Sequence, residues 1–112
     1  MALYNMDKNN KDIRITLENF YNNKEYKKLT DLAWINNEVL ENDIFLLDLV
    51  SKSYYELKQF DRCINFYKKL LAIEPNHRQA NNNIANAYQS LGKSNAAIYH
   101  YKTALKSDSK NT

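Results

Sequence analysis

Hydrophobic residues recur along this chain at the spacing of amphipathic helices. In the middle of the chain, two runs follow an i, i+3, i+4, i+7 pattern on either side of a short polar break: Leu47, Val50, Ser51, Tyr54 and Leu57, then Cys63, Ile64, Tyr67, Leu70 and Leu71. Because a helix turns once in about 3.6 residues, this spacing places the apolar side chains on one face. Each run therefore predicts a helix, and the pair predicts a helical hairpin.

The hairpin pattern returns after 34 residues. Six residues reappear unchanged, with Tyr54, Leu57, Ile64, Tyr67, Lys68 and Leu71 followed by Tyr88, Leu91, Ile98, Tyr101, Lys102 and Leu105. A weaker earlier copy places Phe20 before Tyr54 and Leu29 before Cys63 at the same interval. A fixed period of this length predicts stacked repeats. The predicted units are 10–43, 44–77 and 78–111, after a polar leader at 1–9.

The ends of the helices have recognisable signals. Gly92 is suited to the left-handed conformation after a helix, while Asp61 and Asn95 are candidate N-caps of the helices that follow. Pro75 predicts the end of a helix at about residue 74. We expect helices at about 10–23, 27–40, 44–57, 61–74, 78–91 and 95–107.

These units resemble the tetratricopeptide repeat (TPR), a 34-residue helical hairpin. The residues at its characteristic places are Leu47, Val50, Ser51, Tyr54, Cys63, Tyr67, Leu70 and Pro75 in the middle unit, and Asn81, Ile84, Ala85, Tyr88, Ala97, Tyr101, Ala104 and Ser109 in the last. The first unit departs most, with Leu17 and Leu29 where small residues are expected. The resemblance implies an all-α fold: a right-handed superhelix of three antiparallel helical hairpins, a TPR-like α-solenoid over residues 10–111.

Composition and charge narrow the functional classes. The single Gly and single Pro favour helices joined by short connections. The net charge is +3, but the 16 basic and 13 acidic residues are interspersed, so no nucleic-acid footprint is predicted. The longest apolar stretch, 44–50, is too short for a membrane span, and we expect a cytoplasmic protein with no membrane partner.

Catalytic chemistry has little support in the sequence. The two histidines, His77 and His100, lack the spacing of a metal site, and the lone Gly92 excludes a glycine-rich phosphate loop. Cys63 occupies a tightly packed repeat position, which favours a buried, inert thiol. We therefore expect no enzyme activity, no catalytic residue, no cofactor and no metal.

Binding of a protein or peptide partner is the leading hypothesis. In the TPR family the first helix of each unit lines a concave groove, and the resemblance implies these groove residues: Arg14, Glu18, Tyr21, Asp48, Lys52, Tyr55, Gln79, Asn82, Asn83, Asn86 and Gln89. Asn83 and Asn86 lie on one helix face, where their amides could bond an extended peptide backbone. The alternative is that these asparagines only face solvent.

The carboxylate clamp of chaperone-binding TPR proteins is not matched here. The corresponding positions are Arg14, Glu18, Leu49, Gln79 and Asn83. Only Arg14 keeps the needed charge, and Glu18 repels a carboxylate. A co-chaperone function is therefore not expected.

Two features concern assembly. Trp34 lies beside the divergent helix of the first unit, where local packing is favoured over an interface anchor. The last unit lacks the polar-faced helix that usually covers a terminal TPR hairpin. This leaves two alternatives open: a homo-oligomer formed through the C-terminal hairpin, or an N-terminal accessory module of a longer enzyme.

Overall fold

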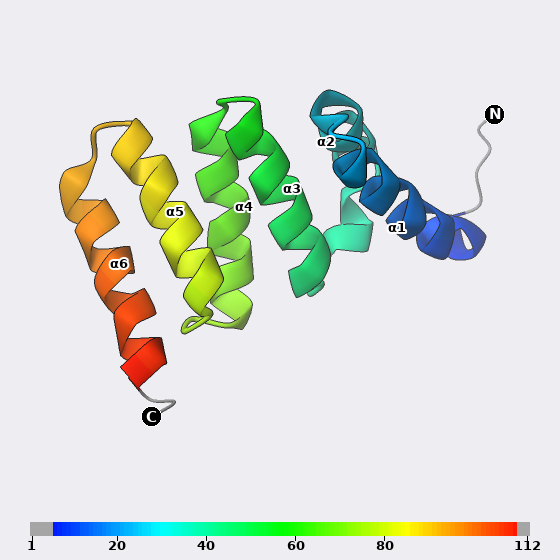
Figure 1. The fold of residues 1–112 in the computed structure, drawn as a ribbon. Coiled ribbons are helices and arrows are strands. Elements are labelled where there is room, and N and C mark those ends of the chain that lie inside the picture. The colour runs from blue at the N-terminus through cyan, green and yellow to red at the C-terminus, as the bar shows by residue number, and fades with distance from the viewer. Residues whose placement is uncertain (1–5, 110–112) are drawn as a thin grey trace.

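The structure is a computed structural model that describes residues 6–109, with side chains for 11–106. Within that range the regular structure is entirely helical (Figure 1). The elements are α1 (Met6–Asn22), α2 (Tyr26–Ile35), the 3₁₀ helix η1 (Asn37–Leu40), α3 (Ile44–Glu56), α4 (Phe60–Ile73), α5 (Arg78–Ser90) and α6 (Ser94–Ser109). The predicted all-α repeat fold is confirmed, and five of the six helices end within two residues of their predicted ends.

Consecutive helices pair as hairpins that stand side by side in a row (Figure 1). The row measures 47 × 29 × 22 Å. α3 packs on both α2 and α4, and α5 packs on both α4 and α6, so each hairpin buries part of its surface against the next. Among the described residues, no helix is both long and apolar enough to cross a membrane.

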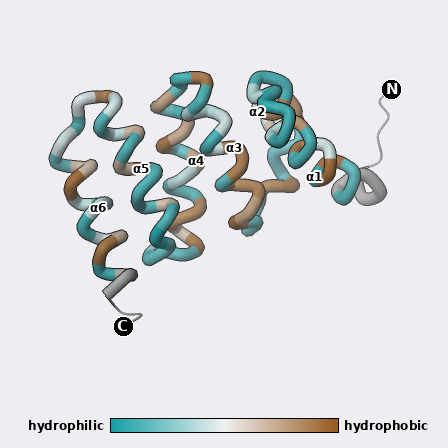
Figure 2. The backbone as a smooth tube through the Cα atoms, viewed as in Figure 1, coloured by the Kyte–Doolittle hydropathy of each residue, from teal (hydrophilic) through white to brown (hydrophobic). Residues whose placement is uncertain are grey.

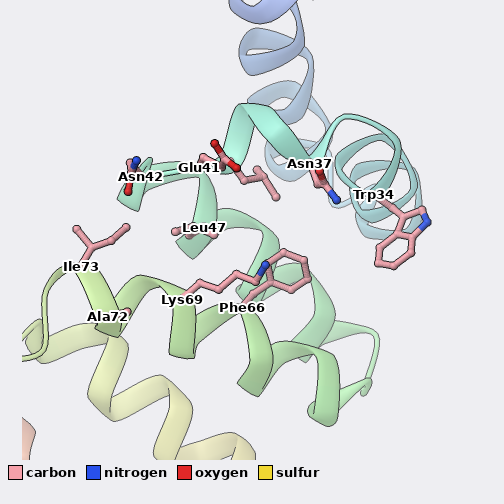
Figure 3. A pocket seen from close by; sticks show the side chains of 10 residues that line it. Trp34, Asn37, Glu41, Asn42, Leu47, Phe66, Lys69, Ala72 and Ile73 are labelled. Carbon is pink, nitrogen blue, oxygen red and sulfur yellow. The ribbon is translucent and has the colours of Figure 1, made fainter.

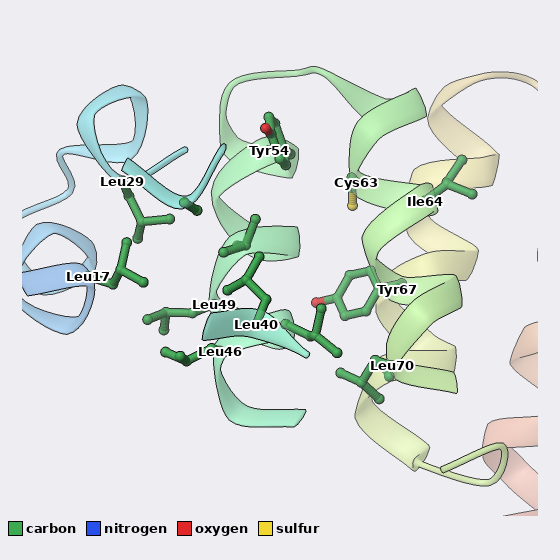
Figure 4. Close-up of a cluster of buried hydrophobic side chains, with 14 of the residues drawn as sticks. Leu17, Leu29, Leu40, Leu46, Leu49, Tyr54, Cys63, Ile64, Tyr67 and Leu70 are labelled. Carbon is green, nitrogen blue, oxygen red and sulfur yellow. The ribbon is translucent and has the colours of Figure 1, made fainter. Parts of the chain in front are cut away.

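The repeat register also describes the core. The two positions of closest helix approach hold Leu17, Ser51 and Ala85 on the first helices, and Leu29, Cys63 and Ala97 on the second, all fully buried. Leu17 and Leu29 point toward each other between α1 and α2 (Figure 4). The first hairpin is therefore packed with two large side chains where the other two hairpins use small ones. Hydrophobic positions are concentrated in α3, at the centre of the row (Figure 2).

Each hairpin turn uses a left-handed residue at the same register position. Gly92 has φ 76°, as predicted, and its counterparts Lys24 and Lys58 have φ 60° and 62°. In every turn the backbone N–H of the residue that follows the left-handed one donates to the carbonyl five residues earlier, as from Gln59 to Tyr54 at 2.9 Å. This is the Schellman arrangement, in which glycine has no steric penalty and lysine does.

Replacing Lys58 with glycine is therefore expected to stabilise the protein, by about 1 kcal/mol, because it removes the left-handed strain from a turn that stays in place. Chemical denaturation followed by circular dichroism measures the change. Gly92→Ala is the matched control: nothing lies within 4 Å of an added Cβ, so backbone strain alone should make that variant less stable. A destabilising Lys58→Gly would contradict this account of the turn.

The predicted N-caps Asp61 and Asn95 were wrong. Only Gln59 separates the left-handed Lys58 from α4, so the helix begins at Phe60 and Asp61 lies inside its first turn. α6 likewise begins at Ser94, which places Asn95 within the helix. The side-chain caps are Asp43, which accepts from the Leu46 N–H, and His77, whose Nδ1 accepts from the Ala80 N–H, each at 3.0 Å.

Two further boundaries differ from the predictions. α1 begins at Met6, so residues 6–9 of the predicted leader are helical, while residues 1–5 lie outside the described range. α2 ends at Ile35 instead of continuing to residue 40. The side chain and the backbone N–H of Asn36 both donate to the Leu32 carbonyl, and the chain then turns into η1. Such local bonding by asparagine competes with helix continuation.

Candidate functional site

A cavity of about 250 Å³ lies where α1, α3 and α5 come together over α4. We call it the groove cavity, and its lining residues are Tyr21, Lys52, Tyr55, Glu56, Tyr67, Gln79, Asn83 and Asn86. Six of these are among the eleven groove residues predicted from the sequence. The structure thus places side chains from all three units around one cavity.

A polar network crosses the floor of the groove cavity. Lys52 Nζ lies 3.2 Å from Asp48 Oδ2, and the Tyr67 hydroxyl donates to Asp48 Oδ1 at 3.0 Å. Asn83 Nδ2 donates in turn to the Tyr67 hydroxyl at 2.9 Å. The network joins α3, α4 and α5, so the polar groups are held in fixed positions before any ligand arrives.

Burial of Tyr67 determines the direction of the hydrogen bonds in this network. Its ring is fully buried, and burial, together with the nearby Asp48 charge, raises the pKa of its phenol far above the ordinary value. The hydroxyl therefore stays protonated and can donate to Asp48 while it accepts from Asn83.

Aromatic contacts fix the rings at the edge of the cavity. The Tyr21 ring packs edge-on against Tyr26 at 5.8 Å between centroids, and Lys52 Nζ lies 5.7 Å from the Tyr21 centroid. Tyr55 packs edge-on against Phe60 at 5.2 Å. Ring positions fixed in this way favour recognition of an apolar side chain at low entropic cost.

Asn86 also bonds to a tyrosine, since it accepts from the Tyr101 hydroxyl on α6. Tyr101 is the repeat counterpart of Tyr67, so α5 is tied by its asparagines to the helix on each side. Asn83 and Asn86 are therefore held by hydrogen bonds and do not simply face solvent. Each bond uses one polar atom of its amide, which leaves the other atom for a ligand.

Other predicted groove residues lie outside the groove cavity. Arg14 and Glu18 form a separate cluster, in which Arg14 bonds Asp43, lies 3.6 Å from Glu18 and covers the Phe45 ring at 5.0 Å. The charge of Arg14 is thus already paired. Asp48 reaches the cavity only through Lys52 and Tyr67. Asn82 and Gln89 are the other two predicted groove residues that do not line the cavity.

Two lining residues, Tyr67 and Glu56, are not among the eleven predicted groove residues, and Tyr67 is the one that joins the polar network. The TPR pattern assigns it to packing between helices, and its buried ring does pack there. The pattern does not reveal that its hydroxyl reaches polar residues of two other helices. The repetition of a tyrosine, in place of a phenylalanine, at residues 67 and 101 was the available signal.

Cys63 and His100, two of the residues considered for catalysis or metal binding, make packing contacts and hydrogen bonds within the fold. Cys63 is fully buried, as predicted, and burial raises the pKa of its thiol to about 12. His100 stacks on Tyr88 and shares a 2.8 Å hydrogen bond with Asn81 Oδ1. Burial, and to a smaller extent the charge of Lys68, lowers the pKa of His100. Among the described residues, no group of three or more His, Cys, Asp or Glu side chains could hold a metal ion.

A larger hollow lies elsewhere, between α2 and α4, and involves Trp34. The expectation that Trp34 completes local packing was wrong, because 61% of its surface is exposed. α2 ends at Ile35, one residue after Trp34, so no further helical turn follows to cover its ring.

The last hairpin presents apolar residues on the outer face of α6. Ile98 is 49% exposed although its counterpart Ile64, which α5 covers, is only 5% exposed. Leu105 is also exposed. The predicted uncovered apolar surface is therefore present on the described part of α6.

Comparison with known proteins supports the repeat assignment. The model of the tetratricopeptide repeat matches residues 47–77 and 79–111, which lie within the second and third predicted units. A curated relative, a probable UDP-N-acetylglucosamine–peptide N-acetylglucosaminyltransferase (SEC) of Arabidopsis thaliana, is 26% identical over 98 residues. That match covers 84% of this chain but only 10% of the relative.

Solved structures share the fold at low sequence identity. A structure of MamA MSR-1 has a TM-score of 0.86 at 21% identity and covers 93% of this chain and 60% of the MamA chain. A structure of MamA AMB-1 has a TM-score of 0.85 at 22% identity and covers 90% and 55% respectively. This chain therefore spans less than two thirds of the solved chains and a tenth of the curated relative.

Proposed function

The chain belongs to the tetratricopeptide repeat family, and from that premise we propose that it is a non-enzymatic scaffold that binds a peptide or protein segment in the groove cavity. Tetratricopeptide repeats form protein-interaction scaffolds. The finer proposal, that the partner occupies this cavity, rests on the meeting of side chains from α1, α3 and α5 around one space of about 250 Å³. We also propose a cytoplasmic location, from the sequence alone.

The cavity suits an extended segment with little net charge. Lys52 is paired with Asp48, and Arg14 is paired outside the cavity, so no surplus positive charge is directed at a ligand. The amides of Asn83, Asn86 and Gln79 offer both donors and acceptors, which match a peptide backbone. The rings of Tyr21 and Tyr55 supply contact for one apolar side chain.

The double substitution Asn83→Ala with Asn86→Ala is expected to lower the affinity for the partner about tenfold, which corresponds to ~1.4 kcal/mol, because two positioned amides are lost. A pull-down with the intact module identifies the partner, and isothermal titration then measures the affinity of each variant. Asn65→Ala with Asn95→Ala is the matched control, since both residues are exposed and neither lines the cavity. Equal affinity of the two double variants would remove Asn83 and Asn86 from the binding site.

A second candidate function is self-association through α6. The exposed Ile98 and Leu105 favour it, because equivalent positions in the second unit are covered by a neighbouring helix. Sedimentation over a concentration series distinguishes it from the scaffold proposal, and a strict monomer counts against it. The match to part of a much longer glycosyltransferase keeps a third candidate, an accessory module of a larger enzyme, as a proposal.

A further inference from the structure

A second hollow, separate from the groove cavity, lies between α2 and α4. It is a hollow of about 620 Å³, and none of its lining residues lines the groove cavity. The buried Leu40 and Leu47 are among its lining residues. α4 contributes Phe66 and Ile73 (Figure 3). We call it the α2–α4 hollow.

The hollow exists because of the early end of α2. The chain leaves the helix at Asn36 and continues as η1, so the second half of α4 has no long helix of the first unit beside it. Leu47 and Phe66 are left lining an open space, although both belong to the core or pack against it.

The corresponding place between the second and third units is closed by polar contacts. There the register puts Asn81 in place of Leu47 and His100 in place of Phe66, and the two are joined at 2.8 Å. Asn81 also donates to the Pro75 carbonyl at 3.1 Å. The same location is thus polar and satisfied in one junction, but apolar and open in the other.

Two cations stand over the aromatic rings of the hollow. The Arg62 guanidinium lies 5.8 Å from the Trp34 ring centroid, and Lys69 Nζ lies 5.4 Å from that of Phe66. Neither belongs to an ion pair among the described residues. They are seven residues apart on α4, about two helical turns or ~10 Å along one face. Glu41 also lines the hollow, beside Asn42 and away from Trp34 (Figure 3).

We propose that the α2–α4 hollow binds an acidic amphipathic segment of a protein partner. An apolar side chain of that segment fills the space between Trp34 and Phe66, and carboxylates on its flanks pair with Arg62 and Lys69. Tryptophan and arginine are enriched among the residues that contribute most to binding at protein interfaces. The carboxylates lie on the side of Arg62 and Lys69, because Glu41 repels them on the other side.

Charge argues against a second copy of this chain docked through α6. The exposed apolar residues of α6 are interspersed with Lys102 and Lys106, both exposed. Placing that face on Arg62 and Lys69 would bring like charges together. An acidic partner is therefore favoured over the apolar face that this chain itself presents.

Trp34 makes the proposal directly testable, because it is the only tryptophan in the sequence. The probes are two labelled model peptides of equal length with the same leucines, one with glutamates and the other with lysines at the flanking positions. We expect the glutamate peptide to bind saturably and to shift the Trp34 emission to shorter wavelength, with at least about tenfold higher affinity than the lysine peptide. A preference for the lysine peptide, or no saturable binding of either, would overturn the proposal.

Two charge-reversal variants locate the binding. Arg62→Glu with Lys69→Glu is expected to lower the affinity for the glutamate peptide at least about tenfold. The control, Lys102→Glu with Lys106→Glu, makes the same charge change on α6 and should leave affinity nearly unchanged. Equal losses in both variants would show general attraction to a basic protein and would overturn the proposal.

Two other outcomes would assign the surface elsewhere. Binding that leaves the Trp34 emission unchanged, or that is lost in Asn83→Ala with Asn86→Ala, would place the peptide in the groove cavity. A shift of Trp34 emission with protein concentration alone would show that a second copy covers the hollow. Any of these results would overturn the proposal that the α2–α4 hollow binds an acidic segment, and would leave the groove proposal intact.

Discussion

Truncating Tyr67 to alanine is expected to cost about 3–5 kcal/mol, enough to unfold a large fraction of a domain of ordinary stability. Its ring is fully buried between the second and third hairpins, so its removal leaves a cavity at the centre of the row (Figure 4). Its hydroxyl also joins Asp48 to Asn83. Urea denaturation followed by circular dichroism measures the loss.

Tyr67→Phe separates the two contributions of this residue. The ring stays and only the hydroxyl is lost, so we expect a cost of about 1 kcal/mol, because Asp48 keeps Lys52 and Asn83 can turn to water. The same variant should weaken a groove-bound partner, since Asn83 loses the bond that fixes it. A Phe variant as unstable as the Ala variant would show that the hydroxyl, and not the ring, carries the stability.

The number and order of helices could be predicted because the apolar positions alone require them. A hairpin repeated at a constant interval, as from Tyr54 to Tyr88, leaves one arrangement in which every apolar face is buried. Gly92 could be assigned its left-handed turn for the same kind of reason. That Lys58 and Lys24 adopt the same conformation could not be predicted from residue type, and only the register indicated it.

The break after α2 could not be predicted, because it depends on a competition between two local arrangements. Asn36 can either continue the helix or bond back to Leu32, and the difference between these states is small. The apolar spacing of Val39 and Leu40 fits a continued helix, and the 3₁₀ segment buries Leu40 equally well. The hollow beside Trp34 follows from this single choice.

The groove residues were predicted in part because a positional rule fixes faces and not contacts. The rule named Lys52 and Asn83, and both line the groove cavity. It could not foresee that Arg14 is held by Asp43, the residue at the end of the first unit that caps α3. Side-chain pairing between elements depends on reach and rotamer, which the helix pattern does not encode.

Replacing Leu29 with alanine is the second large effect, and it runs against the family pattern. The pattern prefers a small residue at this position, as at Cys63 and Ala97, so the substitution makes the first unit more typical. We nevertheless expect a loss of about 2–5 kcal/mol, because Leu29 is fully buried against Leu17 and its truncation leaves a cavity. Cys63→Ala, which removes one atom at the equivalent place, is the matched control and should cost far less.

The loss at Leu29 should also be local. Stability in a repeat stack is roughly a sum of unit and interface contributions, so weakening the first hairpin need not unfold the others. Amide hydrogen exchange is expected to accelerate in α1 and α2 while the core of α5 and the adjoining part of α6 keep their protection. Equal acceleration in all six helices would instead show that the three hairpins unfold as one cooperative unit, and the first hairpin would then be as essential to the fold as the two that match the family model.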